Sequence, residues 1–249
     1  MTPLAPLFDY EKLRAFATTH AASYRHAAPF PHIAIDDFLS TQTVHELVRA
    51  FPDIKKQESQ YGDELRMDDG SFAQREKRWL SSPVAVKPVI RRLYWELNSA
   101  DFLECLELLT GIDGLIPDPH LFGGGLHETR TGGYLNVHAD FNKHPWFRLD
   151  RRLNLLIYLN PDWQAAWGGD LELWERDLSA CVKRISPIAG RAVLFSTTRD
   201  SFHGHPHPLA CPDHVTRKSL ALYYYSHGRP AHEDATEHKT IWQKAGKNA

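Results

Sequence analysis

The stretch GGYLNVHAD, residues 132–140, decides how the rest of this sequence is interpreted. A glycine pair opens it, and a short run typical of a β-strand follows. Residues two positions apart project from the same face of a strand, so His138 and Asp140 are expected to point together. An imidazole and a carboxylate on one strand face are two of the three groups that hold a divalent metal ion such as iron from one side.

A third ligand has to come from a strand that is distant in the sequence. His203 is favoured because it follows the strand candidate RAVLFS (191–196) after a short link. His205 and His207 are competitors for the same role. Imidazole and carboxylate ligands suit Fe(II), and also Zn, Mn, Co or Ni, so the residue types leave the metal open. Arg217 precedes the aromatic run SLALYYYS (219–226), where a guanidinium could hold a dicarboxylic cosubstrate beside the metal.

Further strands are expected on both sides of residues 132–140. RLNLLIYLN (152–160) is a strong candidate, and Gly168-Gly169 marks a turn before DLELWE (170–175). Pro187 and Gly190 mark another turn before RAVLFS. Several short strands separated by turn signals are typical of a β-sandwich or barrel.

The first half of the chain predicts helices instead. One begins at Ser40 or Thr41 and ends before Pro52, a second begins near Pro88, and a third runs from a Ser99 cap to a Gly111 stop. A weaker helix is expected over residues 10–22. Because helices come first and strands later, we expect the helices to pack on the outside of the β unit.

Two polar regions carry little periodicity. Residues 57–79 predict a long loop, either an ordinary surface excursion or a lid over a site. Residues 228–249 predict a loosely held tail. Near the metal motif, a surface role is favoured over substrate contact for Asn136, Trp146, Arg148, Arg151 and Arg152.

The length suits one large domain or two small ones, and we expect one domain over residues 1–249, with helical support mainly in 9–111, a β core mainly in 120–227 and the polar tail after it. A length of 249 residues and a formal charge of −2 fit a single enzyme-sized domain and favour neither a nucleic-acid nor a membrane partner. Three cysteines without a metal-finger spacing predict reduced thiols in a cytoplasmic protein. The oligomeric state stays open.

At this point the sequence resembles a known family, the 2-oxoglutarate- and Fe(II)-dependent dioxygenases, in the branch similar to prolyl 4-hydroxylases. The resemblance covers roughly residues 120–227, and FPHIAIDDFL (30–39) is similar to the branch's N-terminal lead-in. The matching segments, in chain order, are His138-Ala139-Asp140, LIYLNPDW (156–163), GGDLELW (168–174), SFHGHP (201–206) and RKSLALY (217–223).

The resemblance implies a mainly β fold with flanking helices, a double-stranded β-helix or cupin-like jelly-roll barrel. It implies that His138, Asp140 and His203 ligate Fe(II). It also implies that Arg217 binds the distal carboxylate of 2-oxoglutarate, with Ser219 and Tyr158 beside it. The implied cosubstrates are 2-oxoglutarate and O₂, which yield succinate and CO₂ as an unactivated C–H bond of a small molecule, amino acid or peptide is hydroxylated.

Two other functions compete with this interpretation. One is a cupin-like metalloenzyme that does not use 2-oxoglutarate, and Arg217 speaks against it. The other is a non-catalytic sensing or binding barrel, which the combination of three metal ligands with Arg217 disfavours. Substrate identity is beyond the sequence, because a barrel of this kind is a scaffold and its function depends on the site.

Overall fold

The computed structural model describes residues 5–54, 60–61 and 64–243. The helices are α1 (Tyr10–Arg25), α2 (Thr41–Ala50), α3 (Pro88–Leu97), α4 (Ala100–Thr110) and the short 3₁₀ helix η2 (Ala165–Trp167). The strands are β1 (His32–Ile35), β2 (Gln60–Tyr61), β3 (Leu65–Arg66), β4 (Phe72–Leu80), β5 (Ile116–Pro117), β6 (Gly125–Ala139), β7 (Asp150–Tyr158), β8 (Leu171–Trp174), β9 (Cys181–Ile185), β10 (Ala192–Ser196), β11 (His203–His205), β12 (Arg217–Ser226) and β13 (Ile241–Trp242).

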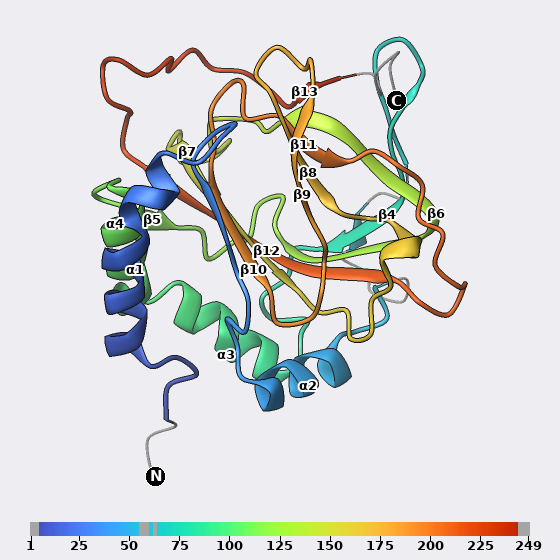
Figure 1. Ribbon diagram of the computed structural model, residues 1–249, viewed down its shortest axis with the longest axis horizontal. Helices are drawn as coiled ribbons and strands as arrows, with labels where there is room; N and C mark the ends of the chain where they lie inside the picture. Colours follow the sequence, from blue (N-terminus) through green and yellow to red (C-terminus); the bar gives the residue numbers. More distant parts are fainter. Residues whose placement is uncertain (1–4, 55–59, 62–63, 244–249) are drawn as a thin grey trace.

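The strands form one antiparallel sheet that curls into a barrel (Figure 1). Its main path runs β1-β10-β7-β12-β6-β11-β8-β9, so most neighbouring strands, apart from β8 and β9, come from distant parts of the chain. The long strand β6 pairs with different strands along its length. Its first part pairs with β12 and its last part pairs with β11. The barrel with outer helices agrees with the mainly β, jelly-roll fold predicted from the sequence.

The four α-helices cover one side of the barrel, as Figure 1 shows. Their ends follow the predicted capping residues. The Ser40 side chain accepts from the Thr43 amide at the start of α2, and Ser99 does the same for Phe102 at the start of α4. Gly111 ends α4 at φ 73°, a left-handed conformation that glycine adopts at little cost.

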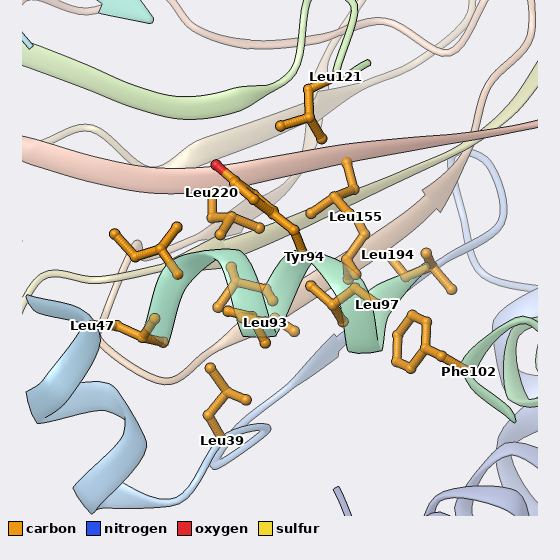
Figure 2. Close-up of a cluster of buried hydrophobic side chains, with 14 of the residues drawn as sticks. Leu39, Leu47, Leu93, Tyr94, Leu97, Phe102, Leu121, Leu155, Leu194 and Leu220 are labelled. Atoms are coloured by element: carbon orange, nitrogen blue, oxygen red, sulfur yellow. The ribbon is translucent and has the colours of Figure 1, made fainter. Parts of the chain in front are cut away.

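The main hydrophobic core lies between these helices and the β10-β7-β12 wall (Figure 2). Alternate residues of β7, such as Leu155, face α3 and α4, where Leu97 and Phe102 pack against them. The intervening residues Asn154 and Leu156 face the barrel interior. Burying one such leucine contributes about 1.5–3 kcal/mol. The core therefore fixes the β10-β7-β12 wall, and the side chains on the other face of this wall project into the barrel.

Two predictions made from polar composition were wrong. Residues 72–80 are not loop but strand β4, which pairs with β6 and brings Gln74, Lys77 and Trp79 into the barrel cavity. Residues 57–59 and 62–63 of the predicted loop lie outside the described residues. The predicted tail is anchored at residues 241–242 rather than loose, because β13 pairs there with the end of β6, and its residues 244–249 lie outside the described residues. No helix within the described ranges has the length and apolarity needed to cross a membrane.

Candidate metal centre and cosubstrate pocket

Three side chains predicted from the sequence meet at one point inside the barrel. One ligand atom from each of His138, Asp140 and His203 can be chosen so that all three lie within 4.8 Å of one another. The Nε2 atoms of His138 and His203 are each 3.5 Å from a different oxygen of Asp140. All three are largely buried. Two imidazoles and one carboxylate, all on one side of the metal ion, are the ligands typical of a non-haem Fe(II) site. Such a site keeps its other coordination positions open.

Strand pairing brings these three side chains together. His203 on β11 stands opposite His138 on β6, and Asp140 follows β6 directly. Gly204 permits the approach, because a Cβ there would lie 2.8 Å from the carbonyl oxygens of Asn136 and Leu135.

Backbone carbonyls orient both imidazoles. His138 Nδ1 is 2.8 Å from the Asn136 carbonyl oxygen, and His203 Nδ1 is 2.9 Å from that of Ser201. A carbonyl can only accept, so each Nδ1 donates, which leaves Nε2 as the nitrogen that a neutral ring offers to a metal. Burial, together with neighbouring His138, lowers the pKa of His203 to about 4, so this ring is neutral at pH 7. Ring orientation by a hydrogen bond on the far nitrogen is typical of metal-binding histidines.

Asp140 is held by two donors from β7. Arg151 donates to its Oδ2 at 3.0 Å and Asn154 donates to the same oxygen at 2.7 Å. Burial by itself raises the pKa of Asp140, but Arg151 and the two imidazoles outweigh it and hold the pKa well below the usual range. The carboxylate is therefore ionised and fixed in direction, as a metal ligand needs to be.

A cavity of about 190 Å³ extends from this cluster into the barrel. Arg217 lies on its wall and is only 6% exposed. Its Nε donates to the Gly169 carbonyl at 2.7 Å, and one terminal nitrogen is 3.4 Å from the Tyr158 hydroxyl. Gly169 makes room for this side chain, because a Cβ there would lie 3.1 Å from Arg217 Cδ.

The other predicted site residues take distinct places. Ser219 lines the cavity two residues beyond Arg217, on the same face of β12. Tyr158 is fully buried and lies behind Arg217 instead of on the cavity wall. Of the competing histidines, His205 is buried on the cavity wall, outside the three-residue cluster. His207 lies near Glu172 with 57% of its side chain exposed.

Sequence reasoning missed several residues of this site. Arg151, expected at the surface, is 1% exposed, and its guanidinium packs 3.4 Å from the centre of the Tyr223 ring. Asn154 and Lys77 also line the cavity. Strand alternation could have found Asn154, because it shares a face of β7 with Tyr158.

A jelly-roll barrel with a His-Asp-His cluster beside a buried arginine defines the class of non-haem iron oxygenases. The sequence profile described as "2OG-Fe(II) oxygenase superfamily" matches residues 124–225, which span β6 through nearly all of β12. This match and the His-Asp-His cluster together identify a 2-oxoglutarate-dependent dioxygenase, for which Fe(II), 2-oxoglutarate and O₂ are the cofactors. No curated protein sequence matches the chain.

Solved structures of low identity share the fold. A prolyl hydroxylase from Trichoplax adhaerens, in complex with a hypoxia inducible factor oxygen degradation domain peptide fragment, is 18% identical with a TM-score of 0.61. That match covers 87% of this chain and 91% of the other. A Pseudomonas putida prolyl-4-hydroxylase is 15% identical with a TM-score of 0.52 over 85% and 99% of the two chains. SnoN, a non-heme alpha-ketoglutarate-dependent epimerase from nogalamycin biosynthesis, is 13% identical with a TM-score of 0.53 over 85% and 84%.

Proposed function

We propose that this protein hydroxylates an unactivated C–H bond of a small molecule or of an amino-acid or peptide substrate. The observation that carries the proposal is the shared cavity. The His138-Asp140-His203 cluster and the buried guanidinium of Arg217 line the same cavity. A keto acid that chelates a metal at the His138-Asp140-His203 cluster can therefore extend its distal carboxylate toward Arg217.

In this proposal His138, Asp140 and His203 hold Fe(II) through two Nε2 atoms and a carboxylate oxygen. When bound, Fe(II) with 2-oxoglutarate and O₂ supplies the oxidising chemistry. The protein supplies position and shielding. Arg217 holds the distal carboxylate with its terminal nitrogens, because Gly169 already occupies its Nε. Ser219 adds a hydroxyl donor, and Tyr158 supports the guanidinium from behind. In this proposal the Asp140 carboxylate takes the metal position that halogenases leave to chloride, which favours hydroxylation or a related oxidation over halogenation.

Part of the remaining cavity wall is aromatic. Aromatic rings of Phe141, Tyr223 and Trp242 line the cavity on which the metal cluster lies. These rings offer apolar contact to the part of the substrate that approaches the metal, and they keep water away from it. A single-domain organisation over residues 1–249 remains part of the proposal.

Anaerobic titration tests the proposal without a known substrate. Adding Fe(II) and then 2-oxoglutarate is expected to produce the visible charge-transfer band of a chelated keto acid. Admission of O₂ is expected to release succinate slowly in the absence of substrate. His138→Ala is the control and is expected to give neither signal. A wild-type protein that gives no band and no succinate would refute the assignment, and a metabolite and peptide screen scored by succinate would follow a positive result.

A further inference from the structure

Two buried cations in the cavity lack an acidic partner. Lys77 on β4 is 7% exposed and Arg217 on β12 is 6% exposed, and both line the cavity. Their charged groups bond only neutral groups among the described residues, namely His127 for Lys77 and Gly169 and Tyr158 for Arg217. Over the described residues, neither cation forms an ion pair with a carboxylate. A buried, uncompensated charge is costly, so such a pair points to an anionic ligand.

The two cations belong to one row across the sheet. Lys77 stands opposite Thr129 on β6, and Thr129 stands opposite Arg217 on β12. Residues directly opposite one another in antiparallel strands share a face. Lys77 and Arg217 therefore enter the cavity from two sides of β6, at the same distance along that strand. The metal cluster lies at the other end of β6, near His138.

The groups around the Lys77 ammonium are polar, and one of them lacks hydrogen-bond partners. Its Nζ lies 3.3 Å from His127 Nδ1. His205, 3% exposed on the same cavity wall, has no hydrogen-bond partner at either ring nitrogen. Burial, and next the charge of Arg217, lower the pKa of Lys77 to about 8. An arriving carboxylate would meet a charged donor at Lys77 and a free imidazole at His205.

We propose that Lys77 is the second cation of the cosubstrate site, so that its ammonium and the Arg217 guanidinium hold the distal carboxylate of the keto acid from two sides. This inference rests on the proposed function and adds a selectivity device to it. A dicarboxylic keto acid compensates both cations, whereas a monocarboxylic one leaves both buried and unpaired. A contact between Lys77 and the distal carboxylate is favoured over one with the oxidised substrate, because Lys77 shares its row with Arg217, whereas the metal ligand His138 lies further along β6.

The test compares two keto acids that differ only at the distal end. 2-Oxoglutarate carries a carboxylate where 2-oxopentanoate carries a methyl group. Dissociation constants for both are measured anaerobically by the charge-transfer band and, with Ni(II) in place of Fe(II), by calorimetry. The variants are Lys77→Met, which keeps the stem but removes the charge, and Lys218→Met as the matched control. Lys218 neighbours Arg217 on β12, but its ammonium bonds Thr216 and lies near the Phe51 ring, away from the cavity.

Lys77→Met is expected to weaken 2-oxoglutarate binding on the order of tenfold to a hundredfold, the range for a lost charge-assisted hydrogen bond. Its affinity for 2-oxopentanoate and for the metal is expected to stay within about twofold of wild type, and Lys218→Met is expected to change neither. Lys77→Gln carries the same comparison if the methionine variant does not fold.

Three results would overturn the inference. Unchanged 2-oxoglutarate affinity without the ammonium removes Lys77 from the site and leaves the proposed function standing. An equal loss for both keto acids shows a general structural role, again with the function intact. A wild-type protein that chelates neither keto acid refutes the proposed function itself, and the Lys77 role with it.

Discussion

Arg151 donates a hydrogen bond to Asp140 at 3.0 Å while its guanidinium packs against the Tyr223 ring. Its Nε also donates to Asn154 Oδ1 at 2.9 Å, so one buried arginine fixes both the carboxylate and its second donor. The direction in which Asp140 faces the two imidazoles is therefore set by β7, not by the strand that carries Asp140.

Removing that guanidinium is expected to weaken metal binding. Arg151→Met leaves Asp140 with one donor and no compensating charge, and loss of such a supporting partner typically costs about 10–100-fold in metal affinity. Chelator competition with Fe(II) or Co(II) measures it. Arg152→Met is the matched control, since Arg152 bonds Ser226 and Glu233 away from the cluster. Equal affinities in the two variants would contradict this role for Arg151.

The third ligand is tested by comparing neighbouring histidines. His203→Ala removes one of three metal donors, so we expect loss of stoichiometric Fe(II) binding. His205→Ala leaves the cluster complete and is expected to retain the metal while weakening 2-oxoglutarate binding. Equilibrium metal titration separates the two outcomes. The reverse ranking would transfer the ligand role to His205.

Gly169 is expected to control the position of Arg217. A methyl group there would lie 2.7 Å from Leu209 Cδ2 and 3.1 Å from Arg217 Cδ, so Gly169→Ala displaces the guanidinium. The expected result is a 2-oxoglutarate dissociation constant raised on the order of tenfold, with metal affinity retained. Gly168→Ala is the control. Gly168 also has a positive φ, but nothing lies within 4 Å of its added methyl group. If both variants bind 2-oxoglutarate equally, steric contact with Arg217 does not matter.

Cosubstrate affinity is expected to fall in alkaline solution. Burial and the charge of Arg217 lower the pKa of Lys77 to about 8, so the empty pocket loses this proton as the pH rises through 8. A bound carboxylate favours the ammonium and raises its pKa, so binding above pH 8 requires proton uptake and weakens by up to about tenfold per pH unit. The other groups near the ammonium are His127, His205, Asp140 and Arg217.

Calorimetry with the Ni(II)-loaded protein between pH 7 and 9 measures this dependence. Lys77→Arg, which stays charged throughout, is expected to show a flatter profile than wild type. Parallel profiles for the two proteins would assign the pH dependence to another group.

The helix ends, and the shared direction of His138 and Asp140, could be predicted from the sequence because each depends on local signals. Ser40, Ser99 and Gly111 mark helix ends through their own chemistry, and His138 and Asp140 share a face by strand alternation alone. Strand β4 was missed because two of its inward residues, Gln74 and Lys77, are polar, so the segment lacks the apolar alternation of a half-buried strand. Arg151 was misplaced because an arginine near a loop usually lies at the surface. The Asp140 carboxylate and the aromatic rings that hold Arg151 come from other parts of the chain, so only the pairing of distant strands reveals them.

The pairing of β13 with β6 places Trp242 against a metal ligand, with its ring centre 4.7 Å from that of His138. This late strand therefore covers one face of a ring that is proposed to bind the metal, so a substitution at residues 241–242 reaches the cluster through the His138 imidazole.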